Sequence, residues 1–198
     1  SRQEDEIDSG TIPKIINGAM QRHLKNRAEC LYLKKYFRGC HPILKRKRIV
    51  REDINNRLVI PNAIAIVRNS NGYFLGEPIQ FTAKRQKDAE NVGRLNDYTD
   101  SEDKACGDMD IGRDASITGR GFRITAADRP EDVDEAPFEI PPLESENTEV
   151  IYSTDAGHRP MLAFYHAPIL NDNGNASGTM YTVYTSEYQY KYLVQGSL

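Results

Sequence analysis

Cysteine is scarce in this sequence, and long apolar runs are absent. The three cysteines, Cys30, Cys40 and Cys106, are odd in number and none belongs to a CxxC pair, which argues against a disulfide framework and a zinc knuckle. No stretch approaches the roughly 18 consecutive apolar residues that a membrane span needs, and the polar N-terminus lacks the apolar core of a signal peptide. We therefore expect reduced thiols, no membrane contact and a cytoplasmic origin.

The motifs that accompany common enzyme chemistries are absent as well. The sequence has no nucleophile-elbow GxSxG, no P-loop, no dinucleotide-binding GxGxxG and no zinc-binding HExxH pattern. Its four histidines are scattered and suggest no ligand set: His23, His41, His158 and His166. We interpret His166, which lies in an alternating segment, as an ordinary core or edge histidine. We therefore expect a non-enzymatic protein with no catalytic residue and no cofactor.

One dense group of carboxylates lies inside a predicted helix and consists of Asp108, Asp110 and Asp114. Its start faintly resembles a calcium loop, but such a loop has a Glu at its twelfth position, where this chain has Gly119. At helical spacing Asp110 and Asp114 share a face, and such a face is more often solvated than metal-bound. We predict no metal site, and a metal-dependent nuclease using these residues is only a third hypothesis.

The net charge of −3 conceals a separation of charge along the chain. Residues 21–51 contain eleven Lys or Arg and a single acid, Glu29, whereas residues 86–160 contain nineteen acids and eight Lys or Arg. Two such patches suit head-to-tail contact between copies, in which unlike charges meet, at least as well as they suit a nucleic-acid site. Both interpretations remain open at this point.

The basic region is densest just after the first predicted helix. It comprises Lys45, Arg46, Lys47, Arg48 and Arg51. Charge runs usually mark exposed faces, so a solvated loop is favoured over a phosphate-contact site. No aromatic side chain interrupts the run, so any nucleic-acid contact here would be to the backbone.

The chain is organised around residues 60–79, which predict a core helix followed by a strand. Five residues recur there with the period of a helix that buries one stripe, and they are Ile60, Ile64, Val67, Asn71 and Phe74. Pro61 can open this helix, and Gly72 and Gly76 can close it. Pro78 then favours an extended exit, so a strand is expected over 79–82.

Another helix is predicted near the N-terminus. Apolar residues keep helical spacing over residues 12–37. Gly39 is the natural C-cap of this helix. A break near Asn26 is left open by the sequence.

A further helix should begin at Thr99, because Thr99 and Glu102 have the form of a capping box after a polar connector over 84–93. Gly107 and Gly112 weaken it by roughly 1 kcal/mol each relative to alanine and suggest close packing. Its inward-facing residues are expected to be Ala105, Cys106, Met109, Arg113, Ser116 and Ile117.

From Gly119 onward, alternation and turn residues predict antiparallel strands. The expected segments are 122–126, 138–140, 150–152, 161–166, 180–185 and 188–193. Residues 171–175 form a loop by composition, and residues 186–187 look like a hairpin turn. The tyrosines at 181, 184, 188, 190 and 192 are interpreted as a half-buried sheet face rather than a binding platform. The fold class is therefore α+β, with two or three helices packed on antiparallel strands.

Taken in order, the local motifs resemble the N-terminal, wing-like part of the portal proteins of tailed bacteriophages, of the siphophage type. The most recognisable stretch is Gly72-Tyr73-Phe74-Leu75-Gly76 followed by Pro78. The other matching stretches are 36–39 with 42–44 and the basic run, 62 with 66–67, 114–121, 159–165, and 183–185 with 190 and 192. The resemblance covers residues 12–193 and depends on the order of motifs, none of which carries chemistry.

The resemblance implies a subunit of a ring, typically of twelve copies, at the capsid vertex where head joins tail. The implied partners are further copies of the chain, the packaging terminase, the head–tail adaptor, capsid and scaffold proteins, and double-stranded DNA passing through the channel. Such a subunit is a virion component made in the cytoplasm of the bacterial host. Family portals are longer than this chain, so we expect a fragment that lacks the stem, clip and tunnel loop.

We expect residues 1–10 to form a frayed tail and residues 11–198 to form one wing-like α+β domain. The leading hypothesis is a structural portal subunit. The alternative is a nucleic-acid-binding module that uses the basic residues of 45–51.

Overall fold

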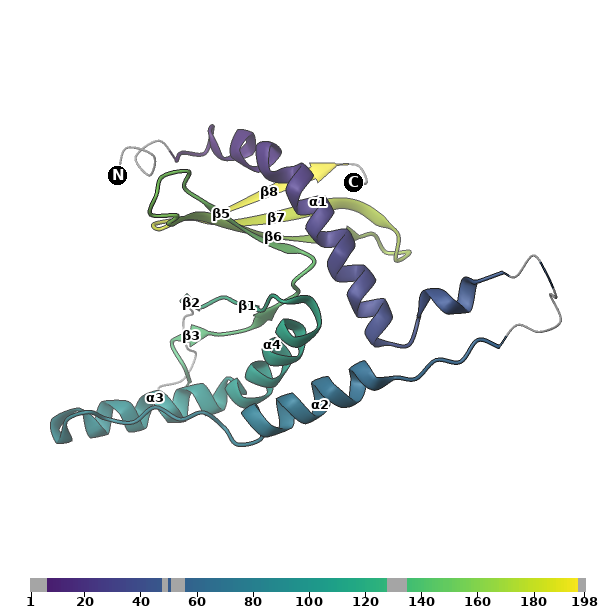
Figure 1. Cartoon of the computed structure of the whole chain (residues 1–198). Coiled ribbons are helices and arrows are strands. Elements are labelled where there is room, and N and C mark those ends of the chain that lie inside the picture. The colour runs from purple at the N-terminus through teal and green to yellow at the C-terminus, as the bar shows by residue number, and fades with distance from the viewer. Residues whose placement is uncertain (1–6, 48–49, 51–55, 128–134, 196–198) are drawn as a thin grey trace. The chain divides into compact units, whose positions relative to one another are not determined.

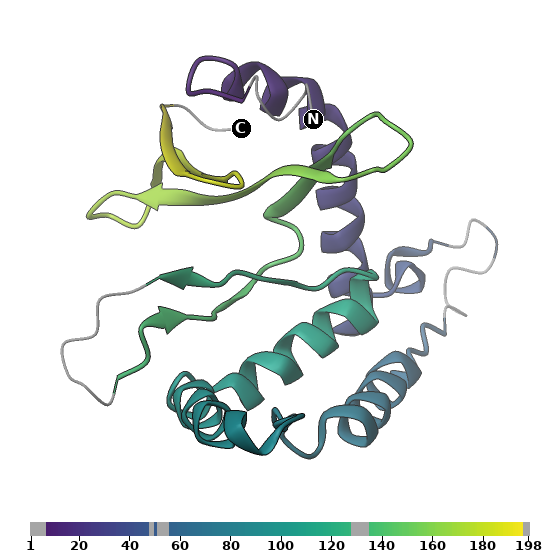
Figure 2. The same ribbon diagram turned by 90° about the vertical axis from the view of Figure 1, so that its left-hand side faces the viewer.

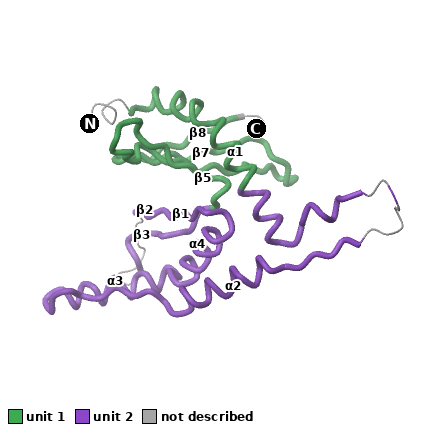
Figure 3. The backbone as a smooth tube through the Cα atoms, viewed as in Figure 1, with its two compact units in different colours: residues 1–29, 144–198 green, residues 30–143 purple. Residues whose placement is uncertain are grey.

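The chain divides into two compact units (Figure 3). A computed structural model describes residues 7–47, 50, 56–127 and 135–195. Unit 1 consists of Ser1–Glu29 and Glu144–Leu198, and unit 2 consists of Cys30–Leu143. Helix α1 (Ile12–Phe37) begins in unit 1 and ends in unit 2. Most of the tail predicted over 1–10 lies outside the described residues.

Unit 1 contains a four-stranded antiparallel sheet with the first part of α1 on one face (Figures 1 and 2). The strands neighbour one another in chain order and are β5 (Thr148–Tyr152), β6 (Pro160–Leu170), β7 (Ala176–Tyr184) and β8 (Gln189–Gln195). Phe164 lies opposite Val183, and His166 lies opposite Tyr181. Each strand therefore pairs with its neighbour in sequence, as short connections favour.

The core of unit 1 lies between α1 and the sheet. Side chains alternate along β6, so Leu162, Phe164 and His166 are buried on one face. The apolar residues that complete this core are Ile12, Ile16, Ala19, Ile151, Tyr181 and Val183. Tyr190 and Tyr192 are half-buried against it, which confirms the sheet-face interpretation for these two tyrosines.

Helix α1 confirms the prediction for residues 12–37. Gly39 ends it in the left-handed region, at φ +86°, and the Cys40 N–H donates a hydrogen bond to the Lys35 carbonyl. The helix is continuous through Asn26. Neither α1 nor any other helix in the described part of the chain is both long and apolar enough to cross a membrane.

The turns between the last three strands lie where the sequence predicts them. In the loop at 171–175, Oδ1 of Asn171 accepts a hydrogen bond from the Asn175 N–H at 2.9 Å. The β7–β8 turn is closed by the Thr185 N–H, which donates to the Tyr188 carbonyl at 2.9 Å. Side-chain and backbone groups of the turns therefore satisfy each other locally.

Unit 2 combines helices with short ladders. Its described residues form α2 (Asn62–Leu75), α3 (Ala89–Ser101), α4 (Lys104–Thr118) and the short 3-10 helices η1 (Pro42–Lys45) and η2 (Gln86–Asp88). Strand β1 (Phe122–Arg123) pairs with β4 (Pro142–Leu143), and β2 (Ala126–Ala127) pairs with β3 (Phe138–Glu139). Helix α2 packs against α4 (Figure 1). With four α-helices and antiparallel sheets among the described residues, the α+β prediction is confirmed.

The prediction of a helix that begins at Thr99 is wrong. The polar connector expected over 84–93 contains η2 and the start of α3, and Thr99 is buried in the last turn of that helix. Its Oγ1 donates to the Asn96 carbonyl at 3.0 Å instead of capping a new helix. Helix α4 begins after Asp103, whose φ of +49° separates it from α3.

The strand expected over 79–82 does not form. The Phe81 N–H donates to Oδ1 of Asn96 at 2.9 Å, and the Phe81 carbonyl accepts from Nδ2 of the same residue at 3.0 Å. A side-chain amide on α3 thus occupies the backbone groups that a neighbouring strand would use.

The buried stripe of α2 was predicted in part. Ile64, Val67 and Asn71 are buried or half-buried as expected. Ile60 and Phe74 are 59% and 79% exposed. The period of the helix was therefore right, but the stripe is shorter than expected.

The inward face of α4 was mostly mispredicted. Ala105 and Ile117 are half-buried, whereas the exposed members of the predicted stripe are Cys106, Met109, Arg113 and Ser116. Close packing at the two glycines is confirmed: an added Cβ at Gly112 would lie 2.4 Å from Leu75, and one at Gly107 would lie 2.7 Å from Arg123. The contacts of α4 thus involve glycines and charged residues, which apolar periodicity does not detect.

Candidate subunit-contact surface

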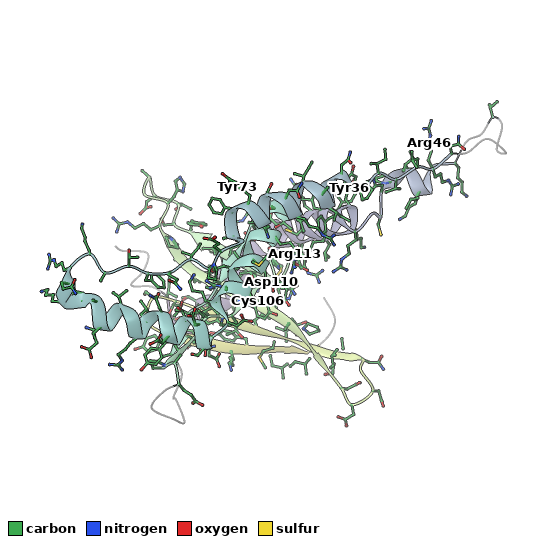
Figure 4. All side chains as sticks on the ribbon, turned by 90° about the horizontal axis from the view of Figure 1, so that it is seen from below. Tyr36, Arg46, Tyr73, Cys106, Asp110 and Arg113 are labelled. Carbon is green, nitrogen blue, oxygen red and sulfur yellow. The ribbon has the colours of Figure 1, made fainter. Side chains whose placement is uncertain are left out.

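The segment 72–78, which carries the family resemblance, covers the end of α2 and the residues after it. Gly72, Tyr73, Phe74 and Leu75 form the last helical residues, and Gly76 and Pro78 follow in the chain. Tyr73 is 94% exposed and Phe74 is 79% exposed, whereas Leu75 is half-buried. Tyr73 projects from the outer side of the helix (Figure 4). The segment therefore has one packed side and one open aromatic side.

The packed side holds α2 on α4. Nδ2 of Asn71 donates a hydrogen bond to the Met109 carbonyl at 2.9 Å. The bare Cα of Gly112 makes room for Leu75 and Asn71, because an added Cβ would lie 2.4 Å from the first and 2.9 Å from the second. Val67 is buried one turn earlier. These contacts fix which side of α2 stays open.

Gly72 and Gly76 differ in whether the surrounding atoms leave room for a side chain. An added Cβ at Gly76 would lie 2.3 Å from the carbonyl oxygen of Gly72, which is far below van der Waals distance. An added Cβ at Gly72 would meet no atom within 4 Å. Only Gly76 is therefore required by the local packing.

The open side of α2 carries large apolar side chains. Ile66 and Tyr73 are seven residues apart, hence on one face of the helix, and both are exposed, as is the adjacent Phe74. We call these three residues the α2 apolar surface. The extended segments that flank the helix expose further apolar side chains, namely Leu58, Ile60, Ile79 and Phe81. Apolar side chains exposed together mark a protein contact more often than scattered single ones do.

The basic run continues past η1 in an extended segment. Lys45, Arg46 and Lys47 are exposed, and Arg46 is labelled in Figure 4. Arg48 and Arg51 lie outside the described residues. The proposed phosphate or partner contact of this run therefore stays a prediction.

Asp108 is held by two cations in unit 2. Its carboxylate lies 2.5 Å from Nζ of Lys104 and 2.6 Å from Nη1 of Arg123. Burial by itself raises the pKa of Asp108, but the hydrogen bonds and positive charges of these two partners outweigh it and lower the pKa below 3.8. The carboxylate therefore links α4 to β1 as an ion.

The other two carboxylates of the predicted acidic group have separate partners. Asp110 pairs with Arg113 at 2.6 Å on the exposed side of α4, and Asp114 pairs with Lys34 at 2.9 Å. Figure 4 labels the first pair. Within the described residues, no group of three His, Cys, Asp or Glu is placed to hold a metal ion.

A buried polar cluster in unit 1 was not foreseen from the sequence. Nε2 of His23 lies 2.9 Å from Nε2 of His166, and Oε2 of Glu149 lies 3.6 Å from Nδ1 of His23. The two histidines are 143 positions apart. The one signal in the sequence was the helical spacing of His23 from Ile12, Ile16 and Ala19, which indicates that His23 faces the core.

The comparisons with known proteins agree with the order of the motifs. Residues 19–197 match the family model described as Phage portal protein, SPP1 Gp6-like. No curated protein matches the chain at a meaningful level. The family match covers most of the chain and extends into both units. The chain therefore belongs to the SPP1 Gp6-like family of phage portal proteins.

Proposed function

We propose that the chain is the wing-like portion of a portal subunit, one of about twelve copies in a closed ring at the head–tail vertex. DNA is packaged and ejected through this ring, and the chain serves a structural role in it. Family membership supports a portal role and a place in the virion. The partners in this proposal are further copies, the terminase, the head–tail adaptor, capsid and scaffold proteins, and double-stranded DNA.

The α2 apolar surface is the observation that supports a contact between copies. Full burial of one large apolar side chain contributes roughly 1.5–3 kcal/mol. Tyr73 and Phe74 obtain little of this within their own chain, because 94% and 79% of their surface is exposed. In a ring each copy meets its neighbour through two different faces, so the α2 surface of one copy packs on another surface of the next.

The test uses the full-length gene product and measures its mass in solution. We expect a ring for the wild type, and at least a tenfold lower ring fraction at fixed concentration for the Tyr73→Ser, Phe74→Ser double variant. Even a tenfold weaker contact corresponds to only about 1.4 kcal/mol, which is below the roughly 1.5–3 kcal/mol that burial of one such side chain contributes. Both side chains are exposed in the chain itself, so circular dichroism should show an unchanged fold.

Tyr188→Ser is the matched control, because Tyr188 is an exposed aromatic residue of unit 1 outside this surface. It should assemble like the wild type. A wild-type product that stays monomeric under assembly-promoting conditions would exclude the ring. Normal rings from the double variant would leave the ring in place and exclude the α2 contact.

A second candidate function is nucleic-acid binding through the exposed basic run. It predicts affinity for double-stranded DNA at low salt, with a logarithmic salt slope of about −0.9 for each phosphate contacted. Replacing Lys45, Arg46 and Lys47 with alanine should weaken binding and flatten that slope, whereas Lys87→Ala should not. Undetectable binding at low salt rules this function out. A basic-run variant that impairs assembly but not DNA affinity would instead indicate head-to-tail contact.

A further inference from the structure

A buried histidine pair joins α1 to the sheet of unit 1. Nε2 of His23 and Nε2 of His166 are 2.9 Å apart, and the exposed fractions of these residues are 1% and 3%. The rings cross at 88° with their centroids 5.0 Å apart. Because one histidine lies on α1 and the other on β6, the contact exists only while α1 is packed on the sheet.

Charged and titratable groups face this pair from the neighbouring elements. On β5, Oε2 of Glu149 lies 3.6 Å from Nδ1 of His23, and Oε1 accepts a hydrogen bond from Nε of Arg22 on α1 at 3.2 Å. On β7, the Tyr181 ring lies 5.5 Å from the His166 ring. Burial raises the pKa of Tyr181, so this phenol stays neutral at ordinary pH. The pair therefore has a carboxylate next to one of its two imidazoles.

The geometry limits how many of the two imidazoles can be cationic at the same time. Two imidazole Nε2 atoms at hydrogen-bond distance share one proton, because one donates its N–H and the other accepts with a lone pair. The Glu149 carboxylate, 3.6 Å from Nδ1 of His23, can offset one positive charge on the pair. A second proton would direct two N–H groups at each other and add a second charge to a buried site.

The pKa of His166 has the direction that this geometry requires. Burial, the nearby His23 and the charge of Arg27 on α1 lower it from 6.5 to about 4. In the unpacked chain the same imidazole titrates near its ordinary value. Between pH 6.5 and 4 the unpacked state therefore binds a proton that the packed state does not, and packing weakens as the pH falls.

We propose that the His23–His166 pair is an acid-sensitive contact that controls the packing of α1 residues 12–29 on the sheet. The packing of the helix is stable while at most one of the two imidazoles is cationic. Protonation of the second imidazole breaks the contact and weakens the packing. This role belongs to unit 1 and is independent of the ring assembly proposed above.

Hydrogen exchange of the whole chain tests the proposal. Protection factors, corrected for the intrinsic exchange rate, should fall on the order of 20-fold between pH 7 and pH 5 for amides of residues 12–29. At pH 5 an imidazole with a pKa of 6.5 is mostly protonated, and one with a pKa of about 4 is mostly neutral. Amides of α4, in unit 2, should change less than about threefold, because carboxylates stay largely ionised in this window.

Two variants separate the pair from other titrating groups. His166→Gln keeps a polar group but cannot take up the proton, so the pH dependence of residues 12–29 should shrink to less than about threefold. His158→Asn is the matched control, because His158 is exposed in the same unit and asparagine tolerates its φ of +41°. It should keep the full wild-type fall. A wild-type fall in His166→Gln, or no fall in the wild type, would overturn the proposal.

The wild-type chain also allows a test that does not depend on a variant folding. Nitrogen NMR of the imidazoles should show one member of the pair still neutral at pH 5 while residues 12–29 remain mostly packed. Two protonated imidazoles at pH 5 with undiminished protection of α1 would contradict the acid-sensitive contact.

Discussion

Replacing Gly76 with alanine should destabilise α2, whereas the same change at Gly72 should stabilise it. An added Cβ at Gly76 would lie 2.3 Å from the Gly72 carbonyl oxygen, about 1 Å closer than a relaxed contact. The obstructing atom belongs to the backbone, so the helix end must shift, and such overpacking costs about 1–3 kcal/mol. Restriction of the unfolded chain offsets roughly 0.5–1 kcal/mol of this, which leaves a net loss of up to about 2.5 kcal/mol.

Gly72→Ala is the matched control, because its added Cβ meets no atom within 4 Å and removal of a helical glycine contributes roughly 0.5–1 kcal/mol. The two variants should therefore differ by about 0.5–3.5 kcal/mol. At 2–4 °C per kcal/mol, thermal unfolding should separate their Tm values by about 1–14 °C, with Gly72→Ala the higher. Hydrogen exchange of the α2 amides should likewise be slower in Gly72→Ala than in Gly76→Ala. Equal stability of the two variants would refute the reasoning, because it would mean that the helix end yields without cost.

Two further pairs of variants test the packing and the charges of α4. Gly112→Ala places a Cβ 2.4 Å from an α2 side chain, so the free energy of unfolding measured in denaturant should fall by up to about 2 kcal/mol. Gly93→Ala, in open space on α3, should raise that free energy by roughly 0.5–1 kcal/mol. An increase in both variants would show that the α2–α4 contact is loose. Asp108→Asn leaves two half-buried cations without their carboxylate and should lose about 1–3 kcal/mol near pH 7, whereas Asp110→Asn, in an exposed pair, should lose less than about 0.5 kcal/mol. Because the pKa of Asp108 is lowered, its contribution is present above pH 3.8 and is lost as the pH falls further, so Asp108→Asn should converge with the wild type in acid.

Elements with a clear period and a clear end were predictable from the sequence. The helix over 12–37 combines regular apolar spacing with Gly39, whose φ of +86° suits glycine. The strands of unit 1 alternate in polarity because one face packs on α1. In both cases the information lies within a few neighbouring residues, which is the range that sequence patterns cover.

Elements that depend on distant partners were not predictable. Helix α3 is mostly polar, and the amide of Asn96 that replaces a strand at Phe81 lies 15 residues away on that unrecognised helix. The histidine pair is more extreme, since its members are 143 positions apart and each alone looks like an ordinary core residue. A hydrogen-bond partner that only the fold supplies leaves no local pattern in the sequence.

The error at Phe74 bears directly on function. Phe74 lies seven positions after the buried Val67, so periodicity placed it on the packed side of α2. Leu75 and Asn71 lie against Gly112 of α4, whereas Phe74 is 79% exposed. Periodicity predicts that an apolar side chain is buried, but it does not predict whether the burying surface belongs to the same chain or to another copy. If the chain assembles into the proposed ring, a neighbouring copy covers Phe74, so the wrong burial prediction and the proposed ring contact have the same physical cause.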